Sequence, residues 1–165
     1  MKKIFALMTV MATLLLTGSC SKDEERDPAE VKQLITSTDW AGYLTEEMHI
    51  NWGNKWENNN QQNYVVIHFD AAGKGQQVEF KTEFMKEQTG YSDFNRIIED
   101  GKIVITYSAK DWNRCYIDYN DVTLDSKTFS GYLWDYTNKD YRFVMKLNAI
   151  SHFDWNSIDK NMTQQ

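Results

Sequence analysis

The chain is predicted to form an all-β domain: an eight-stranded antiparallel up-and-down barrel with a short N-terminal helix. Three observations predict this fold. Apolar residues alternate with a period of two from residue 40 onward, turn signals separate these runs, and the 165 residues contain only one proline. Aromatic residues make up 14% of the chain, and such side chains favour strands.

One helix is predicted over residues 28–36, ahead of the strands. Asp27 suits the N-cap, Pro28 suits the first helical position, and Glu30 follows within the first turn. Together these residues form a helix start signal.

Eight strands are predicted from the alternation of apolar and polar residues. The alternation is plainest in "KIVITY", where Ile103, Ile105 and Tyr107 share one face, and it recurs in "YRFVMKL". Asp100-Gly101 is a strong signal for a two-residue hairpin turn. The predicted strands are 40–50, 64–70, 76–84, 91–98, 102–107, 115–124, 127–136 and 140–148.

The connections between these strands divide into two groups, because consecutive antiparallel strands turn alternately at the two ends of a barrel. The short turns 71–75, 99–101 and 125–126 share one end, called the floor below. The connections 51–63, 85–90, 108–114 and 137–139 share the other end, called the rim. A meander of eight strands removes its open edges by closing, and the helix is expected to enter from the floor.

The first nineteen residues have the order of a secretory signal, with Lys2 and Lys3 before an apolar run and small residues before Cys20. "LLLTGSC" resembles the lipobox of bacterial lipoproteins, and "SKDEERD" resembles the surface-export signal of Bacteroidota lipoproteins. The resemblance implies that Cys20 carries a lipid and holds the protein at the outer membrane, facing the extracellular side. The alternative is plain signal cleavage that leaves Cys20 as a free thiol.

The predicted helix, strand meander and long first connection resemble the lipocalin-like (calycin) superfamily over residues 28–148. Trp40 in "DWAG" lies near the start of the first strand, although no Gly-x-Trp motif precedes it, and Arg142 is the candidate for the late arginine that packs on this tryptophan. The resemblance implies a closed barrel whose large first loop covers the open end.

Four segments are therefore expected along the chain: a signal peptide at 1–19, an acylated tether at 20–27, the barrel at 28–148 and a C-terminal extension at 149–165. The extension contains Phe153, Trp155 and Ile158, which favour a short helical turn packed on the outside of the barrel.

The charge balance argues against nucleic acid as a partner. The net charge is −6, and loss of Lys2 and Lys3 with the leader makes it more negative. Such a surface repels phosphate backbones. Attachment to the membrane is expected to come from the lipid rather than from cationic attraction.

Three tryptophans gather at the predicted rim. Trp52 and Trp56 lie in "NWGNKWENNNQQN", Trp112 lies in the connection 108–114, and Tyr136 borders the same end. Aromatic faces among amide side chains suit a glycan or a small amphiphile. The alternative is that they fold back and plug the rim as a small satellite core.

Polar residues in phase with apolar ones form a second candidate group: Arg96, Glu46 and Asp118. An inward Arg96 could bind an anionic head group, or it could pair with Glu46 or Asp118 as a buried structural ion pair. Bulky residues could also fill the barrel completely, and the examples expected are Phe80, Phe94, Phe129 and Phe143.

The function expected from these observations is non-enzymatic binding of a small amphiphile or glycan at the rim. The alternative is a structural or interaction subunit that contacts an outer-membrane protein partner. No catalytic constellation, phosphate loop or metal-ligand spacing occurs in the sequence, so we expect neither an enzyme nor a cofactor.

Overall fold

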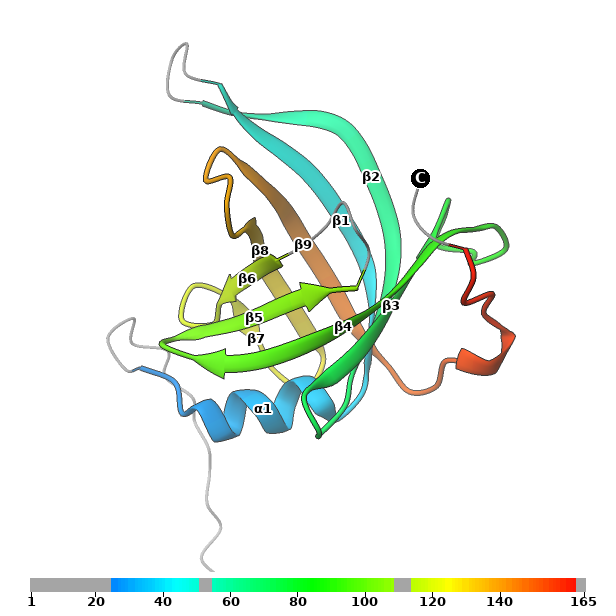
Figure 1. The fold of residues 1–165 in the computed structure, drawn as a ribbon, viewed down its shortest axis with the longest axis horizontal. Helices are drawn as coiled ribbons and strands as arrows, with labels where there is room; N and C mark the ends of the chain where they lie inside the picture. Colours follow the sequence, from blue (N-terminus) through cyan, green and yellow to red (C-terminus); the bar gives the residue numbers. More distant parts are fainter. Residues whose placement is uncertain (1–24, 51–54, 109–113, 163–165) are drawn as a thin grey trace, which may run out of the picture.

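The computed structural model describes residues 25–50, 55–108 and 114–162, except for the side chain of Asn60, and shows one helix and an antiparallel sheet closed into a barrel (Figure 1). The elements are α1 (Pro28–Thr36), β1 (Asp39–Ile50), β2 (Lys55–Phe69), β3 (Lys74–Phe80), β4 (Gln88–Glu99), β5 (Lys102–Tyr107), β6 (Arg114–Asp118), β7 (Thr123–Leu124), β8 (Thr128–Asp135), β9 (Tyr141–Ile150) and the 3-10 turn η1 (Trp155–Ser157).

The barrel closes where β6 pairs with β8. The strand order is β6-β5-β4-β3-β2-β1-β9-β8-β7, and Cys115 opposite Asp135 and Tyr116 opposite Trp134 join its two ends. β6 and β7 are the two parts of the predicted strand 115–124, which is interrupted at 119–122. The barrel therefore has eight strand positions, and the predicted fold class is confirmed.

Helix α1 lies across the floor of the barrel (Figure 1). The Asp27 side chain accepts a hydrogen bond from the Ala29 amide at 2.8 Å, so the predicted N-cap is confirmed. Val31 and Ile35, one turn apart, are fully buried in the barrel core. The Trp40 indole donates to the Ile35 carbonyl at 2.9 Å and so satisfies one of the unpaired carbonyls at the helix end.

The barrel interior is filled by side chains. Trp40 packs edge-on against Phe129, with 5.5 Å between ring centroids, and both are fully buried. Phe94 and Phe143 belong to the same core, as expected. The Asp100-Gly101 turn also matches its prediction, because both residues have positive φ angles of 47° and 75°, as a type I′ turn requires.

The largest difference from prediction is in β2, which begins at Lys55 instead of residue 64. Residues 55–63 were predicted to be loop, but they pair with β1, where His49 lies opposite Trp56 and Leu44 opposite Asn63. Backbone pairing with β1 outweighs the low strand propensity of the Asn and Gln residues. The β1–β2 hairpin consequently rises beyond the other strands at the rim (Figure 1).

A second apolar cluster lies on the outside of the barrel, under the C-terminal segment. Phe153 and Trp155 cover the outward side chains of β1 to β4, and the Trp155 indole donates to the Asp39 carboxylate at 3.2 Å. Phe80 belongs to this outer cluster, so its expected position in the interior is wrong. The alternation rule fails there because the covering segment makes the outward positions of these strands apolar as well.

Gly131 is needed where the turn 119–122 crosses β8. Its φ is 156°, and a Cβ at this position would lie 2.5 Å from a methyl carbon of Val122. Gly131→Ala is therefore expected to lower the free energy of unfolding by about 1–3 kcal/mol through overpacking. Urea denaturation checks this, with Ser130→Ala as the adjacent control, expected to change stability by less than about 0.5 kcal/mol.

Candidate functional site

Arg96 points into the barrel at its floor, as predicted. Its Nη2 donates to the Asp70 carbonyl at 2.8 Å, and its backbone amide donates to Gly73 in the floor turn. Its Nε is buried without a partner among the described residues, and burial lowers the pKa of the guanidinium. Within the described part of the chain, the predicted ion pair with Glu46 or Asp118 is not formed.

Glu46 points inward at the opposite, rim half of the barrel. It is buried, and its carboxylate accepts a hydrogen bond from the Asn59 amide at 2.9 Å. Burial, together with a hydrogen bond to Glu46, raises the pKa of the Tyr141 hydroxyl. Glu46 is therefore hydrogen-bonded to Asn59 and Tyr141 in the rim half of the barrel, whereas Arg96 lies at the floor.

A buried polar network fills the neighbouring part of the interior and was not predicted. The Tyr107 hydroxyl donates to Gln77 at 2.7 Å, and Gln77 donates to Glu79 at 3.0 Å. Asn63 also donates to Glu79, at 3.2 Å. These groups satisfy one another, so the interior is polar near the rim and its polar side chains are paired with each other.

Cys115 is a buried thiol beside this network. Burial, aided by Asp135, raises the pKa of Cys115 from 9.0 to about 12. In the unfolded chain the thiol ionises at its ordinary pKa while the native thiol stays neutral. Stability is therefore expected to fall by about 1.4 kcal/mol per pH unit between these two pKa values, and this contribution is fully present below pH 9.

Urea titrations of the wild-type protein and of Cys115→Ala, at neutral pH and at about pH 11, measure this effect. We expect the alkaline loss of stability to be smaller in the variant. An equal loss in both proteins would show that Cys115 does not contribute.

The predicted rim tryptophans divide into two groups. Trp52 and Trp112 lie outside the described residues. Trp56 lies on the outer face of the β1–β2 hairpin, where its ring centroid is 5.1 Å from that of His49 and 5.5 Å from that of Trp134. Trp56 therefore packs beside the outer wall and not over the barrel opening.

Arg142 contacts two aromatic rings and one carboxylate on this outer surface. Its guanidinium carbon lies 3.9 Å from the Trp56 ring centroid and 3.8 Å from that of Tyr132. Its Nε and Nη2 both approach one carboxylate oxygen of Glu47 at 2.8 Å. The predicted contact of Arg142 with the tryptophan of the first strand, Trp40, is replaced by this sandwich, because Arg142 faces outward.

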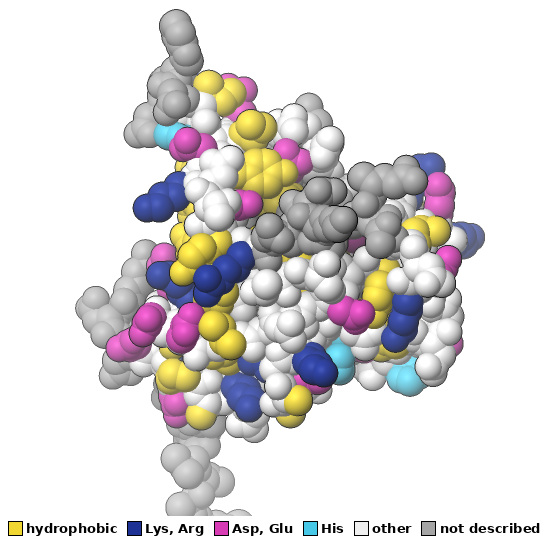
Figure 2. All heavy atoms as spheres, in the orientation of Figure 1, with side chains coloured by type: hydrophobic (Ala, Val, Ile, Leu, Met, Phe, Trp, Pro, Cys, Tyr) yellow, Lys and Arg dark blue, Asp and Glu magenta, His cyan; other side chains and the backbone are white. Residues whose placement is uncertain are grey.

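Aromatic rings continue across the outer face of β8 and β6. Tyr116 stacks with Trp134, and Tyr136 meets Tyr116 edge-on under the guanidinium of Arg114. We call this surface the aromatic wall, and its members are Trp56, Tyr116, Tyr132, Trp134 and Tyr136. In Figure 2 basic and hydrophobic side chains lie next to one another on the side of the molecule that carries β6, in agreement with these contacts.

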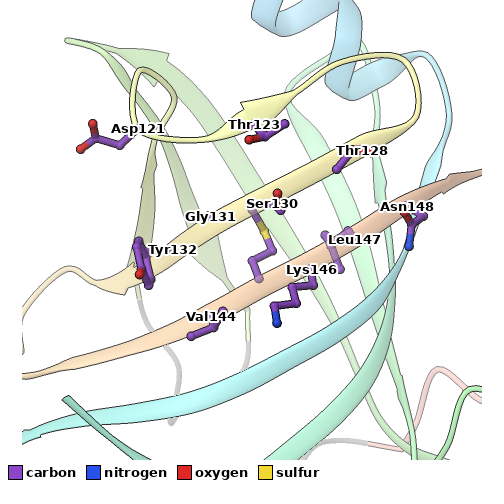
Figure 3. A pocket seen from close by; sticks show the side chains of 11 residues that line it. Asp121, Thr123, Thr128, Ser130, Gly131, Tyr132, Val144, Lys146, Leu147 and Asn148 are labelled. Carbon is purple, nitrogen blue, oxygen red and sulfur yellow. The ribbon is translucent and has the colours of Figure 1, made fainter. Parts of the chain in front are cut away.

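The aromatic wall borders a groove of about 480 Å³ between β7, β8 and β9 (Figure 3). Its lining combines apolar groups with hydroxyl and amide groups, one aromatic ring, one ammonium group and one carboxylate: Val144, Met145, Leu147, Thr123, Thr128, Ser130, Asn148, Tyr132, Lys146 and Asp121. A second pocket of about 310 Å³ shares Tyr132 and Asp121 with the groove. Asp118 lines this second pocket, on the outside of the barrel.

The structure thus brings Trp56 and Tyr136 together on the aromatic wall and puts Asp118 next to it, while Arg96 and Glu46 lie apart inside the barrel. Sequence reasoning missed Tyr132 and Trp134, and it assigned Arg142 to a contact with Trp40 instead of to this surface. A signal was present in "YLWDY", where aromatic residues occupy every second position of one strand.

No family model, curated protein or solved structure matches the chain. Among the described residues, no helix is long and apolar enough to cross a membrane. In the same ranges, no three His, Cys, Asp or Glu side chains converge to form a candidate metal site.

Proposed function

We propose that this protein is a non-enzymatic binding module that holds a glycan in the groove beside the aromatic wall. The observation that supports this proposal is the lining of the groove, where the Tyr132 ring lies at one end and the hydroxyl and amide groups of Ser130, Thr128 and Asn148 follow toward the other end (Figure 3). Aromatic faces stack on the apolar faces of sugars, while hydroxyls and amides bind sugar hydroxyls.

A glycan is favoured over a small amphiphile because the two ligands need different sites. An amphiphile needs a largely apolar cavity, and the barrel interior is occupied by the packed side chains of its core. The groove is open and lies on the outer wall, and it exposes hydroxyl and amide groups beside apolar ones instead of enclosing an apolar ligand. Arg142 covers one face of the Tyr132 ring, and the residue is 37% exposed, which leaves part of the ring available to a ligand.

The test is a titration of the purified protein with a panel of neutral oligosaccharides, followed by tryptophan fluorescence, since Trp134 and Trp56 adjoin Tyr132. We expect one or more sugars to change the emission, and Tyr132→Ala to weaken binding by at least about tenfold. Tyr132→Phe should keep most of the affinity, because it keeps the ring. Tyr43→Ala is the matched control, since Tyr43 lies on another part of the outer wall beside Tyr64.

We further propose that Cys20 is acylated and holds this module at the outer membrane, facing outward. The lipobox-like "LLLTGSC" and the acidic "SKDEERD" support this proposal. Cys20→Ala should shift the protein from the detergent phase to the aqueous phase. A wild-type protein released freely into the medium would contradict the anchor.

A second candidate function, as an interaction subunit, is favoured by the rim loop 81–87. Phe84 at its tip is 71% exposed, and the adjacent Met85 has a positive φ of 53°, which is uncommon for a residue with a side chain. Lys81 pairs with Glu87 at the base of this loop, at 3.1 Å. Affinity purification from intact membranes tests this candidate, because a stoichiometric protein partner lost in Phe84→Ser would support it.

A further inference from the structure

The second pocket, which adjoins the groove, has a lining suited to positive charge. It is bounded by two carboxylates, two aromatic rings and one aliphatic side chain: Asp118, Asp121, Tyr132, Trp134 and Val122. We call it the acid-aromatic pocket. Its volume of about 310 Å³ is enough for one small organic group.

The rings of this pocket already accept a cation in the folded protein. The Arg142 guanidinium carbon lies 3.8 Å from the Tyr132 ring centroid and 5.1 Å from that of Trp134. Arg142 is itself neutralised, because two of its nitrogens contact Glu47 at 2.8 Å. Both rings therefore take part in cation–π contacts, and Arg142 itself is not among the residues that line the pocket.

The two carboxylates of the pocket belong to Asp118 and Asp121. In the described ranges, the ion pairs do not include Asp118 or Asp121. Asp118 accepts one hydrogen bond from the Asn120 amide. Lys102 is opposite Asp118 in the β5–β6 register, but its ammonium lies over the Tyr116 ring, 5.4 Å from the centroid.

We infer that the acid-aromatic pocket takes a protonated amine carried by the bound glycan, as in an amino sugar whose nitrogen is not acylated. An ammonium group is attracted by the ring faces and by both carboxylates, whereas a neutral acetamido group is attracted by neither charge. The inference rests on the proposed function, since the pocket shares Tyr132 and Asp121 with the groove. It adds that the ligand is cationic.

The experiment compares an oligosaccharide of glucosamine with the same oligosaccharide fully N-acetylated, by calorimetric titration at a pH at which the amine is charged. The amine form should bind about tenfold more tightly at low salt, and the difference should shrink as salt is added. Asp118→Asn and Asp121→Asn are close in size to the native residues and should each reduce this preference. Glu57→Gln removes one negative charge from an exposed position on β2 and serves as the matched control, which should keep the preference.

A third titration uses choline and its uncharged isostere 3,3-dimethylbutanol, which separates the charge from the sugar. If both oligosaccharides bind equally, the glycan function stands and the inference about charge is overturned. If neither oligosaccharide binds but choline binds in preference to its isostere and its binding depends on Asp121, the pocket binds a cation and the glycan function fails. If none of the four ligands binds to the folded wild-type protein, both the glycan function and the inference about charge are overturned.

Discussion

Arg142→Met is expected to lower the free energy of unfolding by about 3 kcal/mol. The guanidinium is only 11% exposed and Glu47 is 19% exposed, so the change leaves a largely buried carboxylate without its partner. It also removes the cation between Trp56 and Tyr132, on which the position of the β1–β2 hairpin depends. Urea denaturation measures the loss, and Trp56 should become more exposed to fluorescence quenchers.

Two further variants separate the charge from the packing. Glu47→Gln combined with Arg142→Met should recover part of the lost stability, because no charge is then left unpaired. Arg114→Met is the matched control: Arg114 also covers an aromatic ring, but it is 39% exposed and lies 3.8 Å from Glu99. It should cost less than about 1 kcal/mol. If Arg142→Met and Arg114→Met lower the free energy of unfolding equally, Arg142 does not stabilise the fold through its buried contacts with Glu47, Trp56 and Tyr132.

Trp40→Ala is expected to cost about 3–5 kcal/mol, as removal of a large, fully buried side chain does. Trp40 joins three parts of the fold, because its ring packs on Phe129 and its indole donates to Ile35 at the end of α1. Trp40→Phe keeps a ring and loses the hydrogen bond, so it should cost less, about 1–3 kcal/mol. Thermal or urea unfolding distinguishes the two variants, and a loss below about 1 kcal/mol for Trp40→Ala would contradict its central position in the core.

Local sequence signals were sufficient to predict most of the fold. The N-cap at Asp27 and the Asp100-Gly101 turn each act over a few residues, so their chemistry can be identified without tertiary information. Alternation predicted the inward faces of β5 and β9 for the same reason. The floor and the rim followed from counting antiparallel strands.

The extension of β2 could not be predicted from its own composition. Residues 58–63 are all Asn or Gln, which favour loops, and only their partners on β1 make them a strand. The outward position of Phe80 likewise depends on Phe153, which is more than seventy residues away. Both features are therefore determined by contacts between residues that are distant in the sequence.

The candidate site was predicted at the rim but lies on the outer wall, for a related reason. Trp56 was assigned to a lid because 51–63 was predicted to be a loop, whereas the strand directs its ring toward Arg142. The regular spacing of Tyr132, Trp134 and Tyr136 could have predicted an aromatic face on β8. The sequence did not tell whether that face would be covered, as the outer face of β3 is, or exposed.

The central claim is that this protein binds its ligand on the outer wall and not inside the barrel. Backbone amide NMR during titration with the tightest-binding oligosaccharide tests this claim most directly. We expect chemical-shift changes to concentrate in the segments 118–134 and 144–148, which contain the residues that line the groove and the acid-aromatic pocket. Changes concentrated instead at Glu46, Gln77 and Tyr107, which lie in the buried interior, would contradict it.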